Sequence, residues 1–328
     1  MDTPLNAKLT RLSQSCHFNK LPAALTILAV ASVGIAFTFT SRAATPFASI
    51  EPEQGAKTAG ATVGNDDTAS GGQFVQFGGG AVSETAKPGP TNTGPTNSSE
   101  LAPSGSITIT QDGAVVENVA VNGIVRIQAN NVTIRNFRIN GGGASYGIQA
   151  TYGYSGGIIE DGEVYNVNSA GIYGGGFTAR RLNVHESGGD AVKPTSNVVF
   201  ETSWLHNLGT NDGAHADGFQ SVGGSNYTFR GNNCDMPVTD PPPYKSNACF
   251  IIQTNNSPID NVLIENNWLN GGNFTVYVTD KGNGHGAPTN ARILNNRFGR
   301  DYRYGLFRTD GNPIVSGNVW EDTGELVP

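Results

Sequence analysis

Short segments in which apolar and polar residues alternate recur through the last two thirds of the chain, from Ser106 to Pro328. The clearest is Val132-Thr-Ile-Arg-Asn-Phe-Arg-Ile139, and each segment predicts a strand with one buried face. Further copies begin at Ile158, Phe177, Val198, Tyr227, Val262, Ala291 and Pro313. An interval of roughly 20 to 50 residues is too short for a domain and is typical of stacked repeats that share one continuous core.

A second apolar strand follows the first in each repeat, and its third residue is apolar in every copy. We expect this third residue to face the core and the fourth to point outward. Because stacked strands lie about 4.8 Å apart, the fourth residues should form a ladder along one face. The ladder reads Gln149, Tyr173, Lys193, Gln220, Gln253, Tyr277 and Phe307. Aromatic faces and amide edges suit sugar rings and hydroxyl groups, although an ordinary solvated face has the same pattern.

The residue after each first strand belongs to a second predicted column. Its members are Asn140, Tyr165, His185, His206, Asp235, Asn270 and Gly299. The loops that leave this column lengthen to His206–Ala216 and Asp235–Ala248 in the central coils, and such insertions commonly make a cleft on a rigid support. The alignment therefore predicts that one group of side chains meets within two or three neighbouring coils. This group is His185, Asp190, Lys193, His206, His215, Asp217 and Asp235.

Residues 1–44 predict a signal peptide or an N-terminal membrane anchor. Three basic residues, Lys8, Arg11 and Lys20, precede an apolar run over residues 21–40 that is just long enough to span a bilayer. Both alternatives stay open, and under either one the basic end stays in the cytoplasm. We therefore expect a secreted or cell-surface protein that meets the membrane only through residues 21–40, if that segment is retained.

Two short regions separate this leader from the repeats. Residues 45–80 predict a short β segment, with strand character at Gln73-Phe-Val-Gln-Phe77. The pieces Glu51-Pro-Glu53 and Ala69-Ser-Gly-Gly-Gln-Phe-Val75 resemble the edges of a galactose-binding-like carbohydrate module. Residues 81–105 are rich in Pro, Thr, Asn and Ser and predict a linker too poor in apolar residues to fold.

Composition and charge narrow the class of protein. The chain has 328 residues, 44 of them glycine, and lacks long amphipathic helical segments after Arg42, which favours an all-β protein with many turns. The formal net charge of −7 argues against a nucleic-acid-binding protein, which needs a basic face. An acidic glycan stays open as a partner, because a local basic groove can coexist with a negative total charge. We expect a monomer.

The cysteines indicate one disulfide. Of the three, Cys16 precedes the apolar run, whereas Cys234 and Cys249 are close together downstream of it. An exported chain would pair Cys234 with Cys249, and closing a loop of about 15 residues contributes roughly 3 kcal/mol. Two buried thiols are the alternative.

The repeat over residues 106–328 resembles a right-handed parallel β-helix of the pectate-lyase-like superfamily, because its eight copies agree in pattern. The resemblance implies an all-β solenoid of about eight coils. This fold carries lyases, hydrolases, epimerases and non-catalytic adhesins, so the activity must be argued from the site.

The predicted group of side chains suits a polysaccharide lyase that acts on a uronic-acid-containing glycan by β-elimination. Such an enzyme neutralises a carboxylate, removes the neighbouring proton and lets the glycosidic oxygen leave. The candidate bases are Lys193, His215, His206 and His185. The candidate calcium ligands are Asp190, Asp217 and Asp235. The candidate glycan-binding residues are Tyr173, Gln220, Gln253, Tyr277 and Arg308. Extracellular lyases of the superfamily use comparable acid clusters and basic residues, so the resemblance favours this scheme.

Other interpretations stay open for the same residues. Two carboxylates on neighbouring coils would suit a glycoside hydrolase, and His185, His206 and His215 are suitable transition-metal ligands. The same residues could also have no function in catalysis or binding. Asp217 could be only a turn residue, His185 and His206 could be a stacked surface pair, and Lys193 could merely neutralise Asp190. A non-catalytic module that binds glycan or a neighbouring cell is the alternative from a different class.

Overall fold

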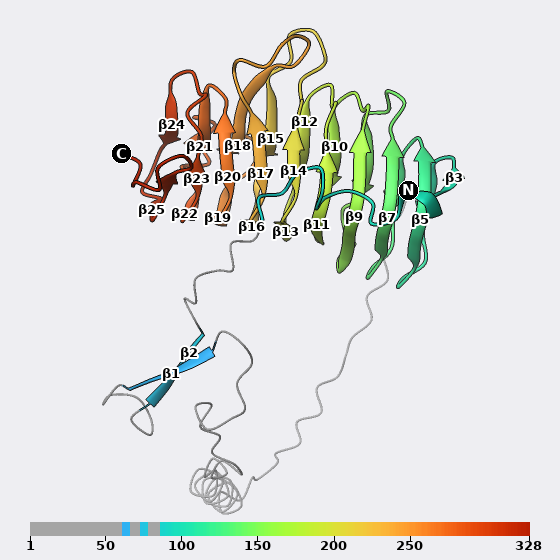
Figure 1. Cartoon of the computed structure of the whole chain (residues 1–328), viewed down its shortest axis with the longest axis horizontal. Helices are drawn as coiled ribbons and strands as arrows, with labels where there is room; N and C mark the ends of the chain where they lie inside the picture. The colour runs from blue at the N-terminus through green and yellow to red at the C-terminus, as the bar shows by residue number, and fades with distance from the viewer. Residues whose placement is uncertain (1–60, 66–72, 78–85) are drawn as a thin grey trace, which may run out of the picture. The chain divides into compact units, whose positions relative to one another are not determined.

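The computed structural model describes residues 61–65, 73–77 and 86–328 (Figure 1). The chain divides into two units, Met1–Val82 and Ser83–Pro328. In the first, β1 (Ala61–Asn65) pairs antiparallel with β2 (Gln73–Phe77). The predicted signal peptide or anchor, residues 1–44, lies outside the described residues. Within the described ranges, no helix is long and apolar enough to cross a membrane.

The second unit is an all-β solenoid of parallel strands, which agrees with the predicted β-helix-like architecture (Figure 1). One of its two sheets, here called the ladder sheet, contributes one strand per coil and has nine strands within residues 86–328. These strands are β4 (Ile107–Ile109), β6 (Val125–Ile127), β8 (Tyr146–Ala150), β10 (Ala170–Gly174), β12 (Asp190–Pro194), β15 (Ala216–Ser221), β18 (Ser246–Thr254), β21 (Phe274–Asp280) and β24 (Gly305–Thr309).

The other sheet, here called the bent sheet, turns a corner within each coil. The first strand, β3 (Ala102–Ser104), pairs with the part of β5 that follows the corner. In the next coils one strand runs through the corner: β5 (Val115–Asn122), β7 (Thr133–Asn140), β9 (Gly157–Tyr165) and β11 (Phe177–Val184). Later coils use two strands: β13 (Val198–Glu201) and β14 (Trp204–His206), β16 (Gly224–Arg230) and β17 (Asn233–Met236), β19 (Ile259–Glu265) and β20 (Trp268–Gly271), β22 (Thr289–Leu294) and β23 (Arg297–Phe298), β25 (Ile314–Ser316) and β26 (Val319–Trp320). The corner residue has a left-handed backbone, as at Asn136 (φ 46°) and Asp161 (φ 56°), a conformation that Asn and Asp tolerate well.

The core consists of inward side chains that repeat once per coil. Equivalent positions of the bent sheet are fully buried and paired from coil to coil: Ile134, Ile159, Ala179, Phe200, Phe229, Ile264 and Ile293. One strand buries too little apolar surface to be stable alone, so the stacking itself makes the core.

Buried asparagines complete the backbone hydrogen bonding at the corners of the later coils. Asn267 shows the pattern: its Oδ1 accepts from the backbone N–H of Asn232 (2.8 Å), and its Nδ2 donates to the carbonyl of Phe229 (3.0 Å). Asn296 and Asn318 repeat the arrangement in the next coils. Each of these asparagines therefore satisfies buried backbone groups where the strand is interrupted.

The predicted linker, residues 81–105, differs from the structure over residues 86–105, where the structure describes it. Residues 86–101, here called the strap, lie along the corner of the bent sheet and cross successive coils (Figure 1). Hydrogen bonds along its length hold it, among them Asn233 Nδ2 to Pro88 O (2.9 Å), Gly94 N to Arg181 O (3.0 Å) and Asn97 N to Asn136 Oδ1 (3.0 Å). The strap needs few apolar residues, because polar and backbone groups already presented by the solenoid bind it.

Candidate functional site

The outer face of the ladder sheet carries the predicted ladder through its central coils. Tyr173 is paired with Gln149 on one side and with Lys193 on the other, and Val192 opposite Phe219 brings Gln220 into the next place. Tyr173 also stacks on Tyr146 at a ring distance of 4.7 Å. The predicted order Gln149, Tyr173, Lys193, Gln220 is therefore confirmed.

The predicted register is wrong beyond Gln220. Phe219 pairs with Phe250, so Ile251 follows Gln220 in the ladder and Gln253 lies two places further along β18. Because β18 is apolar at several successive positions, its sequence does not define which residues face the core. The stacking of Phe219 on Phe250, with ring centres 4.8 Å apart, favours the observed register.

A second error concerns the end of the ladder. Tyr277 pairs with Arg308, so Arg308 lies in the row where Phe307 was predicted. Phe307 instead turns inward and packs edge-on against Phe298, with ring centres 5.1 Å apart. The corrected row is Tyr173, Lys193, Gln220, Ile251, Tyr277 and Arg308.

Asp190, Lys193 and Asp217 form a connected group at the start of β12 and β15. Lys193 Nζ lies 3.1 Å from Asp190 Oδ2, and the backbone N–H of Asp217 donates to Asp190 Oδ1 at 2.8 Å. Asp217 is fully buried, and its two oxygens accept from Gln220 Nε2 (3.1 Å) and Asn247 Nδ2 (2.8 Å). Every oxygen of both side chains thus has a hydrogen-bond donor, as buried polar groups require.

Burial raises the pKa of both carboxyls. For Asp190 the burial outweighs the opposing effect of the Lys193 ammonium and of the Asp217 amide. For Asp217 burial and then the nearby charge of Asp190 raise the pKa well above its usual range. Two acids whose pKa values are raised by burial, next to an open surface, are typical of a functional site.

His215 joins this group at the surface. A hollow of about 440 Å³ opens at the amino-terminal ends of the ladder strands, and Asp190, Lys193, Gln220 and His215 are among its lining residues. His215 ends the first long loop, and Lys245 of the second long loop donates to the carbonyl of Asn211 at 2.9 Å. The first long loop therefore lines the hollow, and the second long loop contacts the first through Lys245.

His185 and His206 lie on the bent sheet and not in this hollow. His185 stacks between Tyr165 (5.4 Å) and His206 (5.2 Å), and Trp204 stacks on His206 at 3.5 Å. Burial, followed by the charge of His185, lowers the pKa of His206 to about 4. The predicted column is correct, but the sheet turns between it and the ladder, so these histidines do not share the hollow with Asp190.

The predicted calcium ligands do not fit a calcium ion. Asp235 lies on the bent sheet, where it is paired with His206 and Asn270. The oxygens of Asp190 and Asp217 already face N–H and ammonium donors, whereas calcium needs six to eight free oxygen ligands. Across residues 86–328 and the two short strands before them, no group of three or more His, Cys, Asp or Glu side chains could hold a metal ion.

Cys234 and Cys249 form a disulfide, with Cα atoms 5.8 Å apart. The bridge links β17 to β18 and closes the second long loop. It lies in the core behind Gly218, where an added Cβ would lie 2.7 Å from the Cys234 sulfur. Glycine at that position thus lets Asp217 sit next to the bridge.

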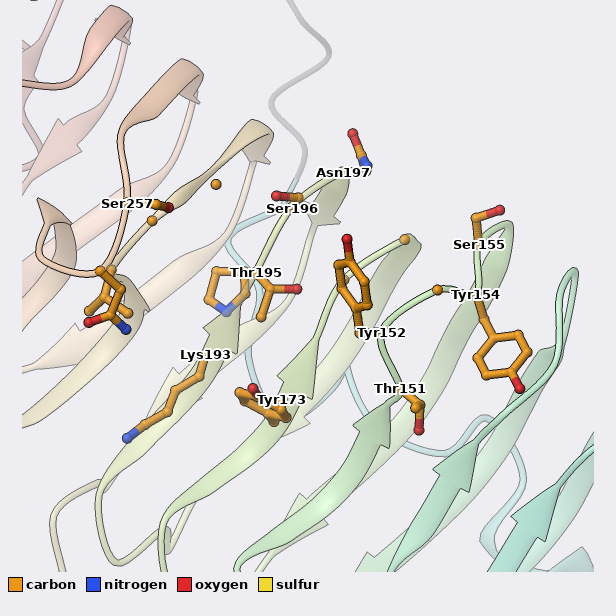
Figure 2. A pocket seen from close by; sticks show the side chains of 18 of the residues that line it. Thr151, Tyr152, Tyr154, Ser155, Tyr173, Lys193, Thr195, Ser196, Asn197 and Ser257 are labelled. Carbon is orange, nitrogen blue, oxygen red and sulfur yellow. The ribbon is translucent and has the colours of Figure 1, made fainter. Parts of the chain in front are cut away.

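A larger pocket opens at the carboxyl-terminal ends of the same ladder strands. Its volume is about 620 Å³, and Figure 2 shows Tyr173 and Lys193 on neighbouring strands, with Tyr152 and Tyr154 on the turn beyond β8. The sequence analysis missed Tyr152 and Tyr154. Two tyrosines in a glycine-rich turn, Thr151-Tyr-Gly-Tyr-Ser-Gly-Gly157, were the available signal.

Comparison with known protein families, with curated proteins and with solved structures returns no match for this chain.

Proposed function

We propose that this chain is an extracellular, right-handed β-helix protein of the pectate-lyase-like type that cleaves a uronic-acid-containing glycan by β-elimination. One observation carries the proposal: Lys193, held 3.1 Å from the nearly buried Asp190, opens into the same hollow as His215. A fixed cation and an imidazole are the two groups that this reaction needs.

The cation stabilises the charge that develops during the reaction. Lys193 binds the carboxylate of the reacting uronate, and Asp190 holds the ammonium in place. When the proton on the carbon beside that carboxylate leaves, negative charge spreads onto the carboxylate, where Lys193 faces it. Interactions that strengthen as charge develops lower the barrier, and those made equally with the bound substrate do not.

His215 handles the proton. As a neutral imidazole it removes the proton at C5, and the electron pair of that C–H bond becomes the C4–C5 double bond. The bond between C4 and the glycosidic oxygen then breaks, its electron pair goes to the oxygen, and the protonated imidazole returns the proton to it. The products are one unsaturated uronate end and one new reducing end, with no oxidant and no added water.

The test is incubation with polygalacturonate, alginate and hyaluronan, with calcium or with a chelator, while the absorbance of unsaturated uronate and the reducing ends are measured. We expect both signals to rise together and to persist in chelator. Lys193→Ala and His215→Ala should each lower the rate about 100-fold or more, because general acid–base groups contribute roughly 10²–10⁴. Lys281→Ala and His285→Ala, on a separate loop after β21, are the matched controls. Full activity in both site variants would refute the assignment.

A glycoside hydrolase is the second candidate, and the two buried acids favour it. A carboxyl whose pKa is raised by burial can hold the proton that a departing glycosidic oxygen needs. Asp217 is 1% exposed, which keeps it from substrate, so Asp190 alone would have to serve. Reducing ends without unsaturated product in the same assay would select this candidate, and no product from any glycan would favour a binding module.

The disulfide supports the extracellular part of the proposal. Disulfides form and persist in oxidising compartments and are rare in the cytosol. The Cys234–Cys249 bridge therefore fits export through the apolar segment of residues 21–40. A blocked-thiol assay on protein from the growth medium or cell surface tests this, since free Cys234 and Cys249 would contradict it.

A further inference from the structure

The pocket beyond the ladder strands has the size and lining of a sugar-binding site. Its volume of about 620 Å³ lies within the range of roughly 300–1,000 Å³ that is usual for small-molecule sites. The rim carries Tyr152, which is 97% exposed, and Figure 2 shows it on the turn above Tyr173. An aromatic ring this exposed in a turn makes no contribution to the core, so its packing does not explain it.

The lining is suited to the hydroxyl groups of a sugar. Hydroxyl and amide side chains from three turns surround the pocket: Thr195, Ser196, Asn197 and Ser257 are among them. Of the described residues that line it, none is acidic, and Lys193, whose ammonium faces Asp190, is the one basic residue. Tyr173 presents a ring whose orientation is set by its stacking on Tyr146, so little ordering is needed on binding.

The pocket and the hollow meet at the same two residues. Lys193 and Gln220 line both cavities, which lie at opposite ends of the ladder strands. The intervening strand, β12, has five residues, or roughly 16 Å at 3.3 Å each. A glycan that lies along the strands would pass over Lys193 from the hollow into the pocket, whereas one that follows the row of outward residues would pass from Lys193 over Ile251 and Tyr277 to Arg308.

We propose that the pocket binds the sugars next to the reacting uronate, so that the glycan crosses the ladder sheet along its strands. The substrate is then an oligomer or polymer of uronate, with its reacting unit in the hollow and its neighbours stacked on Tyr152 and Tyr173. This inference rests on the proposed function for the identity of the reacting unit. The binding of sugar in the pocket does not depend on cleavage.

The experiment compares the two directions in which a glycan could lie. Tyr152→Ala should raise KM about tenfold on the glycan that the wild type cleaves and leave kcat within about twofold, because it removes stacking that is equal in substrate and transition state. A tenfold change corresponds to about 1.4 kcal/mol. Tyr152→Phe should restore the wild-type KM. The matched control is Tyr304→Ala, an exposed tyrosine of a later coil, which should stay within about twofold. Arg308→Ala, at the far end of the corrected row, tests the other direction.

The opposite pattern would overturn the proposal. If Arg308→Ala and Tyr304→Ala raise KM and Tyr152→Ala does not, the glycan follows the stack of coils. If the wild type cleaves none of the three polymers, the proposed function fails, and calorimetry with tetrasaccharides of each polymer still tests the pocket. Binding that weakens about tenfold in Tyr152→Ala but not in Tyr304→Ala supports the pocket, and binding unaffected by Tyr152→Ala, or absent altogether, rejects it.

Discussion

Replacing Lys193 with methionine separates a catalytic role for this residue from a purely structural one. The ammonium of Lys193 is 3.1 Å from Asp190 Oδ2, with side-chain exposures of 28% and 4% respectively. Lys193→Met keeps most of the aliphatic stem and removes the charge. The Asp190 carboxylate would then keep only the Asp217 backbone N–H as a hydrogen-bond donor.

The magnitude follows from how deeply the pair is buried. An exposed ion pair contributes about 0–1 kcal/mol, whereas removing one partner of a fully buried pair costs about 3–5 kcal/mol. One member here is buried and the other is partly exposed, so we expect Lys193→Met to lower the free energy of unfolding by about 2–3 kcal/mol. Asp190→Asn in the same chain removes the unpaired charge and should restore most of that loss.

The assay is urea unfolding followed by far-ultraviolet circular dichroism, together with the lyase measurement on each folded variant. We expect the double variant Asp190→Asn/Lys193→Met to regain stability but to stay at least about 100-fold less active than the wild type. Recovery of activity in the double variant would show that Lys193 only neutralises Asp190, and the proposed reaction would lose its cation. An unchanged free energy of unfolding in Lys193→Met would contradict the burial argument.

Three further outcomes follow from the structure. Asn267→Ala should lower the free energy of unfolding in urea by about 2–6 kcal/mol, because two buried backbone groups lose their partner at about 1–3 kcal/mol each; an effect below 1 kcal/mol would contradict this role. Removing both Cys234 and Cys249 as serines should cost roughly 3 kcal/mol in the same measurement, whereas reductant should leave the double variant unaffected. Burial raises the pKa of Asp217, so this carboxyl keeps its proton in the folded state at pH values above about 4, where the unfolded chain has released it. The free energy of unfolding should therefore fall as the pH rises from about 4 through the raised pKa. Asp217→Asn cannot ionise and should flatten that fall in a series of urea midpoints against pH, and an equally steep fall would exclude Asp217 as its source.

Much of the solenoid could be predicted from the sequence, because each strand repeats the same local pattern. The alternation of apolar and polar residues defines which side of a strand is buried, and that relation holds whatever the rest of the chain does. The outward positions of Tyr173, Lys193 and Gln220 follow from this pattern, because the apolar residue before each of them must face the core. The pairing of Cys234 with Cys249 was likewise local, because a short loop brings them together.

Other features depend on contacts that no local pattern contains. The register of Gln253 and Phe307 was decided by aromatic packing across coils, at Phe250 and Phe298, where several apolar residues could have faced the core. The strap has few apolar residues, so no local pattern predicts that it is ordered. Its hydrogen-bond partners belong to coils far away in the sequence.

The division of the predicted site has the same cause. Residue order correctly placed His185 and His206 one coil apart, and correctly placed Asp190 beside Lys193. The angle between the two sheets then separated the histidines from the acids and left His215, on a long loop, as the histidine of the hollow. Position along a strand is a property of the local sequence, whereas the direction in which each sheet faces is a property of the whole coil.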